Sequence, residues 1–389
     1  MSPRGKLDAI DGLRGLAVLS VVAFHQRLCW DRLPTPTLVH RLLAPSRFGY
    51  VGVHLFLVLS GFCLTHSLLR RHREGRPPTL RRYLLDRWRR IAPPYYIAMF
   101  LCIILACITD GPAGWPGGRQ LAYHLAFLHG LRPDTLGAIN APFWSLSIEF
   151  QFYLWLPLLF AASLRFGVLP TLAGVLAMSL AWRIYVLGVL PGDQWLLMGT
   201  FAGRWAEFAA GMAIAWWHDR RLASGPSWPT LACAVGAALC FALGVDLSRR
   251  GFAVVVGLDY LFGAAAALLV VAALRSSTYG GKLSRALSTR PLAWVGAISY
   301  SVYLTHDPIL NLARDLYFRL RPGRTSLGDA VELTVAAAAV LLAGWTFHVV
   351  VERRFLRSVD AGRPRPAAVV RPTQLSAVAE AALIPLESA

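Results

Sequence analysis

Two ionisable side chains, Arg14 and His25, lie within the first apolar stretch of the chain, DGLRGLAVLSVVAFH. Eleven steps of about 100° bring a helix only about 20° past three full turns, so both side chains share one face, about 16 Å apart along the axis. Ionisable groups inside an apolar helix are costly and are typical of functional sites. The alternative is that each side chain extends to its own membrane surface and only flanks a span.

The imidazole of His25 suits general-base chemistry, because histidine exchanges protons near neutral pH and a hydroxyl nucleophile needs a base. Glu149, in FWSLSIEF, is the leading candidate to orient that ring. An isolated carboxylate in an apolar span costs about 2.5 to 3.5 kcal/mol and should find a donor. The alternative is a structural ion pair between Glu149 and a buried arginine such as Arg183 or Arg204.

Further polar side chains lie in or beside apolar segments. Ser147 is expected either to donate a hydrogen bond in the same site as Glu149 or to bond a carbonyl of its own helix. Tyr300, Tyr303 and His306 follow at three-residue steps in SYSVYLTHDP and form a slanting polar ridge on a helix. Taken by itself, the ridge is typical of an aromatic anchor at the membrane surface.

Arg87 and Arg90 lie three residues apart, on one helical face, directly before IAPPYY. Guanidinium groups bind phosphates in a fixed, forked geometry, so this pair predicts a phosphate-binding site. No glycine-rich phosphate loop is present, and arginines alone would have to hold such a ligand. The arginines from Arg70 to Arg82 are better explained as cytoplasmic positive charge.

The composition indicates an all-α polytopic membrane protein. Of 389 residues, 56% are hydrophobic and 15% charged, and the mean hydropathy is +0.50. Apolar segments of about 20 residues suit a bilayer core of about 30 Å. We expect about ten transmembrane helices, near residues 10–30, 50–70, 93–110, 143–163, 168–190, 199–217, 229–245, 252–274, 294–314 and 329–350. The weaker segment 121–131 is expected to be an interfacial helix or an extra span.

The arginine-rich loops predict a multi-pass protein of the cell membrane with both termini in the cytoplasm. The net charge of +18 then reflects topology and attraction to anionic lipids, and nucleic-acid binding is not expected. Six cysteines without CxxC spacing indicate neither a disulfide framework nor a metal site. The integral membrane domain is expected over residues 1–356, followed by a disordered cytoplasmic tail over 357–389.

Five motifs occur in the order typical of one family: KLDAIDGLRGLAVLSVVAFH, VGVHLFLVLSGFCLT, RRYLLDRWRRIAPPYY, FWSLSIEFQFYLWLPLL and ISYSVYLTHDPIL. Over about residues 6–356 the chain resembles the acyltransferase 3 family of integral membrane acyltransferases. The resemblance implies transfer of an acyl group, often acetyl, from coenzyme A to a hydroxyl of a carbohydrate, a lipid or a secondary metabolite such as a macrolide. It also implies that Arg14 and His25 are the functional pair and that Arg87 and Arg90 contact the acyl-CoA donor. The ridge of Tyr300, Tyr303 and His306 is, by the same resemblance, part of the site region.

We therefore expect acyl-CoA as a substrate and no resident cofactor. Its head group would stay in the cytoplasm, held by Arg87, Arg90 and Arg14, while its thioester reaches His25 within the membrane. Direct attack needs fewer assumptions than an acyl-histidine, and both routes remain open. The alternative from another class is a transporter or flippase that uses intramembrane Arg, Glu and His for passage of a substrate or proton.

Overall fold

The computed structural model describes residues 4–31, 43–190, 192, 196–197, 200–221, 228–251, 257–320 and 326–356. Within these ranges the regular structure is helical, without strands. The predicted all-α polytopic membrane fold is thereby confirmed. The tail over 357–389, predicted to be disordered, lies outside the described residues.

Each of the ten expected spans overlaps a long helix. Among the described residues, seven helical segments are long and apolar enough to cross a membrane, and they include α3, α4, α7, α8, α11, α12 and α16. The other three, α1, α10 and α15, carry charged residues in their apolar stretches, so the count of ten remains a prediction. The long helices are α1 (Arg4–Asp31), α3 (Gly52–Arg73), α4 (Leu80–Asp110), α7 (Trp144–Phe166), α8 (Val168–Val189), α10 (Phe201–Arg221), α11 (Trp228–Arg249), α12 (Asp259–Tyr279), α15 (Ser299–Leu320) and α16 (Ser326–Phe347).

Short helices join the long ones. The segment expected to be an interfacial helix or an extra span forms only α5 (Gly118–Leu125) and a 3₁₀ turn at His129–Leu131, so it is too short to be a span. The remaining short helices are α6 (Pro133–Leu136), α13 (Lys282–Leu287), α14 (Arg290–Ala297), the 3₁₀ turns Ala44–Val51, Gly111–Gly114 and Ala141–Phe143, and the π-helical turn His348–Glu352.

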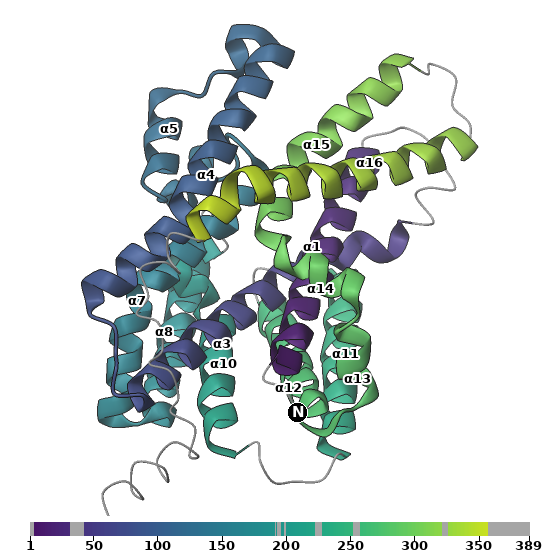
Figure 1. Cartoon of the computed structure of the whole chain (residues 1–389). Helices are drawn as coiled ribbons and strands as arrows, with labels where there is room; N and C mark the ends of the chain where they lie inside the picture. Colours follow the sequence, from purple (N-terminus) through teal and green to yellow (C-terminus); the bar gives the residue numbers. More distant parts are fainter. Residues whose placement is uncertain are drawn as a thin grey trace, which may run out of the picture.

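Figure 1 shows α3 and α10 between the pair α7 and α8 on one side and the pair α11 and α12 on the other. The helices α15 and α16 pack against each other, and α1 contacts α3, α14 and α15. The main apolar core joins side chains of α1, α3, α4, α7, α10, α15 and α16. This core surrounds the polar residues identified in the sequence.

Glycines allow the helices that carry these residues to approach closely. A Cβ atom on Gly61 of α3 would overlap the backbone of α10, and one on Gly211 of α10 would overlap α3. In the same way, a Cβ atom on Gly296 of α14 would overlap the Asp11 carbonyl of α1. Close packing fixes the position of α1 along its axis relative to the neighbouring helices, and hence the position of Arg14.

A hydrogen bond from outside the helix holds α15 one turn before its internal proline. Pro308 has no N–H group, so the carbonyl of Leu304 lacks its helical donor, and Asn140 Nδ2 donates to it at 3.4 Å instead. At the other end of α15, Ser301 donates to Glu352 Oε2 at 2.6 Å. These bonds fix the rotation of the helix that carries Tyr300, Tyr303 and His306.

Candidate active site

A cavity of about 270 Å³ lies among α1, α3, α4, α7 and α15. It brings Arg14 of α1 together with Arg87 and Arg90 of α4, which lie far from it in the sequence. Its other lining residues are Phe56, Leu59, Ser60, Cys63, Leu64, Ser67, Ile91, Glu149, Tyr153 and Tyr300. We call this space the arginine cavity.

Positive charge outweighs negative charge in the arginine cavity, where the carboxylate of Glu149 lies among the three arginines. Within the described part of the chain, none of them forms an ion pair, and Arg87 Nε is buried without a hydrogen-bond partner. Three guanidinium groups around one cavity repel one another unless an anion lies between them. With three guanidinium groups and one carboxylate among its lining side chains, the arginine cavity can bind an anion.

A smaller chamber of about 70 Å³ adjoins the arginine cavity. Both spaces are lined by Arg14, Phe56, Glu149 and Tyr300, so they meet at these side chains. We call the smaller space the inner chamber. Its remaining lining residues are Val53, Leu57, Ser145, Leu146, Ser299 and Tyr303.

Glu149 lies where the two spaces meet, but it does not contact His25. Its Oε1 accepts hydrogen bonds from Ser60 Oγ at 3.3 Å and from the hydroxyl of Tyr153. The expectation that Glu149 orients His25 is therefore wrong for this structure. The alternative pairing with Arg183 or Arg204 is also wrong, since both arginines pair elsewhere.

The tyrosines of the ridge on α15 line the inner chamber. Tyr300 also lines the arginine cavity, and its hydroxyl donates to the Ile91 carbonyl at 2.9 Å. The Tyr303 hydroxyl donates to the Pro142 carbonyl at 2.8 Å and lies 2.6 Å from Ser145 Oγ. Both tyrosines are thus fixed inside the bundle, which does not fit the alternative of an anchor at the membrane surface.

The third member of the ridge, His306, is fully buried and contacts His25. The ring centroids lie 4.8 Å apart at an interplanar angle of 75°. His306 Nε2 is 3.4 Å from His25 Nδ1, and the His25 Nδ1 atom also lies 2.9 Å from the Val21 carbonyl oxygen. The Tyr303 ring, which lines the inner chamber, lies 5.5 Å from that of His306.

Ser147, in contrast, lies outside both spaces. Its hydroxyl donates to the Phe127 carbonyl at 2.7 Å and accepts from Gln151 Nε2 at 3.1 Å. It therefore anchors the segment after α5 to α7, and neither of the two expected roles applies. Its neighbour Ser145 lines the inner chamber instead.

A second group of charged residues is buried near the starts of α3, α10 and α12. Asp259 accepts from Arg183 Nη2 at 3.0 Å and lies 2.9 Å from Arg204 Nη1. Glu207 lies 3.1 Å from both Arg204 Nη1 and His54 Nδ1. All five side chains are almost fully buried, and we call them the ion cluster. The described residues contain no group of three side chains arranged to hold a metal ion.

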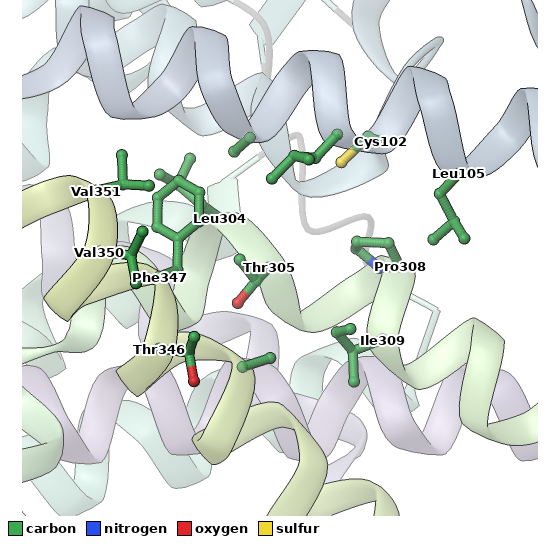
Figure 2. A pocket seen from close by; sticks show the side chains of 13 residues that line it. Cys102, Leu105, Leu304, Thr305, Pro308, Ile309, Thr346, Phe347, Val350 and Val351 are labelled. Atoms are coloured by element: carbon green, nitrogen blue, oxygen red, sulfur yellow. The ribbon is translucent and has the colours of Figure 1, made fainter.

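An apolar groove of about 420 Å³ lies between α4, α15 and α16. Figure 2 shows its walls, with Leu304, Thr305 and Pro308 on α15 and Phe347 and Val350 opposite. Helical steps of about 100° put these α15 residues on the face opposite Tyr303 and His306. The groove therefore does not open onto the histidine pair.

Several residues of the site were not identified in the sequence. Tyr153 follows Glu149 by four residues, so the helical repeat could have indicated that hydrogen bond. Ser60 belongs to the LSGF motif, and Phe56 and Cys63 lie one turn to either side of it. Only the packing of α3 against α7, together with the ring contact between Phe56 and Tyr303 of α15, brings these side chains to the cavity.

Residues 7–349 match the acyltransferase-domain model Acyl_transf_3. The chain therefore belongs to the acyltransferase 3 family of integral membrane acyltransferases. This membership classes it among enzymes, which does not fit the alternative of a transporter or flippase.

Relatives of the chain are bacterial acetyltransferases. It is 27% identical over 347 residues to the peptidoglycan O-acetyltransferase OatA of Listeria monocytogenes, covering 79% of this chain and 50% of that protein. It is 27% identical over 342 residues to the putative peptidoglycan O-acetyltransferase YrhL of Bacillus subtilis, covering 79% and 49%. The O-acetyltransferase OatA of Staphylococcus aureus is 24% identical over 359 residues, covering 81% and 52%. The chain spans about half the length of these relatives, and no solved structure matches it.

Proposed function

We propose that the chain is an O-acyltransferase of the cell membrane. It transfers an acetyl group from acetyl-CoA, the acyl-CoA donor, to a hydroxyl group. The acceptor is a carbohydrate, a lipid or a secondary metabolite such as a macrolide. The observation that carries the proposal is the convergence of Arg14, Arg87 and Arg90 on one cavity, where none of them forms an ion pair with a described residue. Coenzyme A supplies a 3′-phosphate and a pyrophosphate, the anions that forked guanidinium groups bind best.

The two connected spaces match the two parts of the donor. The arginine cavity, at about 270 Å³, receives the phosphates, with Arg87 and Arg90 contacting them. Arg14 lines both spaces and contacts the donor between its phosphates and its thioester. The inner chamber, at about 70 Å³, suits a short acyl group such as acetyl.

His25 is the general base of the reaction. The acceptor hydroxyl gives its proton to His25 while its oxygen attacks the thioester carbonyl carbon. The C–S bond then breaks, and the leaving thiolate takes up a proton to release free coenzyme A. Direct transfer of this kind needs no acyl-enzyme. The donor thioester would approach His25 from the inner chamber, past the side chain of Tyr303.

We infer that both termini lie in the cytoplasm. The arginine cavity opens near the end of α3 and the start of α4, where arginines are abundant. Acyl-CoA is made in the cytoplasm, and the rule that positive loops face the cytoplasm gives the same side. The acceptor approaches from the outer side or from the lipid. The names of the relatives favour a carbohydrate hydroxyl on the outer surface.

The direct test is thioester consumption by the purified protein in detergent. Radiolabelled acetyl-CoA is incubated with a panel of hydroxyl acceptors that includes chitooligosaccharides, a polyprenol-linked sugar and a macrolide. The expected result is release of free thiol together with label on one of these acceptors. An absence both of thiol release and of saturable CoA binding would reject the proposal.

A further inference from the structure

We propose that His306 is a positioning residue that fixes the proton of His25 on Nδ1 and keeps its Nε2 available as the base. The inference rests on the proposed function of His25 and names the residue through which that ring is oriented. The sequence pointed to Glu149 for this task, but Glu149 bonds Ser60 and Tyr153.

The hydrogen bonds of the two rings define where each proton lies. A carbonyl oxygen only accepts, so His306 Nδ1, 2.8 Å from the Tyr303 carbonyl, carries a proton. A neutral His306 then has a lone pair on Nε2, and this atom lies 3.4 Å from His25 Nδ1. The same reasoning applies to His25, whose Nδ1 lies 2.9 Å from the Val21 carbonyl.

The proton on His25 Nδ1 is therefore shared between two acceptors, the Val21 carbonyl and His306 Nε2. Three-centre bonds of this kind are common near helix backbones. The second ring nitrogen of His25, Nε2, makes no hydrogen bond to any described residue. It is left as the lone-pair atom that can take a proton from the acceptor hydroxyl.

His306 also favours the charged form of His25 that arises during the reaction. When Nε2 of His25 takes up a proton, the Nδ1–H group becomes a stronger donor, and both of its acceptors are already in position. The edge-to-face contact of the rings, at 75°, directs the edge of one ring at the other. Because His306 is fully buried and its Nδ1 is tied to the backbone, it cannot turn away from His25.

Two substitutions of His306 test this role. His306→Ala removes the acceptor, whereas His306→Gln keeps an amide oxygen within reach of His25 Nδ1. A hydrogen bond to a charged group is worth about 1.5 to 3 kcal/mol, so we expect His306→Ala to lower kcat about 10- to 150-fold. The KM for acetyl-CoA should stay within about twofold, because the donor phosphates bind elsewhere. His306→Gln should recover most of kcat.

Thr305→Val is the matched control. Thr305 is the preceding residue of α15, lines the apolar groove and donates only to the Ser301 carbonyl of its own helix, at 3.0 Å. This variant should keep the kcat of the wild type. The proposal is overturned if the kcat of His306→Ala equals that of the wild type. It is also overturned if His306→Ala and His306→Gln lower kcat equally and each loss of kcat parallels a loss of melting temperature. A wild-type protein that neither binds CoA nor consumes acetyl-CoA would instead reject the proposed function.

Discussion

Arg14 of α1 and Arg90 of α4 line the same cavity, although 76 residues separate them in the sequence. Neither forms an ion pair within the described part of the chain. Charges of one sign are costly to gather unless a ligand compensates them. The pair therefore supports the proposed donor site, which the first prediction tests.

Arg87→Ala and Arg90→Ala should each raise the KM for acetyl-CoA about tenfold or more and change kcat little. A phosphate contact far from the reacting carbonyl stabilises the ground state and the transition state alike. Lysine at either position should restore the KM only in part, since it keeps the charge and loses the fork. Steady-state kinetics with varied acetyl-CoA measure the effect.

The control is Arg89→Ala, because Arg89 lies between the two on α4, is exposed and does not line the cavity. Its donor KM should equal that of the wild type. If all three variants behave alike, Arg87 and Arg90 serve topology and not donor binding.

Glu149→Gln should lower kcat by about tenfold or more without raising the donor KM. The carboxylate lies where the arginine cavity meets the inner chamber, and glutamine keeps an oxygen for the bonds from Ser60 and Tyr153. Kinetics and the melting temperature in detergent are measured on the same preparation. A loss of activity that only matches a loss of stability would assign Glu149 a structural role.

Asp259→Asn should destabilise the protein strongly, by about 3 to 5 kcal/mol, because it leaves Arg183 and Arg204 buried without their shared carboxylate. Thermal melting in detergent measures the loss. Asp246→Asn is the control, since the Asp246–Arg250 pair is exposed and should contribute less than about 1 kcal/mol. Equal melting temperatures for the two variants would contradict a stabilising ion cluster.

Acid should destabilise the segment after α5 through His129. Burial, assisted by the neighbouring His124, lowers the pKa of His129 from 6.5 to about 3. Below about pH 6.5 the unfolded chain binds a proton that the folded state excludes. The contribution of His129 to the free energy of unfolding is therefore complete above this pH. It decreases towards pH 3 by up to about 1.4 kcal/mol per pH unit.

Melting temperatures at pH 7.5 and 5.5 measure this loss. His129→Gln keeps a donor for the Phe143 carbonyl and should show a smaller decrease between the two pH values than the wild type. His72→Gln changes an exposed histidine. Its melting temperature should decrease between the two pH values by as much as that of the wild type. An unchanged decrease in His129→Gln would contradict the assignment.

The long helices follow from the sequence because apolar segments of about 20 residues have one stable form in a bilayer. The helical repeat also put Arg87 beside Arg90 and joined Tyr300, Tyr303 and His306 into one ridge. These inferences concern residues of one helix, where spacing alone fixes geometry.

Partners on different helices could not be inferred in the same way. Glu149 was assigned to His25 because both are polar in apolar spans, yet helix packing brings His306 to His25 and Ser60 to Glu149. The order of the spans along the sequence does not determine which helices contact one another or how each helix is rotated about its axis. The ion cluster was missed for the same reason, since its members come from α3, α8, α10 and α12.

In the proposed reaction, acyl-CoA bound by the arginine cavity reacts with an acceptor activated by His25. The most direct measurement is His25→Ala, with turnover of acetyl-CoA and CoA affinity determined on the same purified protein. Cys63 lines the arginine cavity and is exposed, so protection of this thiol from a maleimide reagent reports CoA binding, with Cys63→Ser as the blank. We predict that His25→Ala loses about 100-fold or more in turnover while CoA protects Cys63 as in the wild type. Near-normal turnover in His25→Ala, or a wild-type Cys63 that CoA does not protect, would contradict the account.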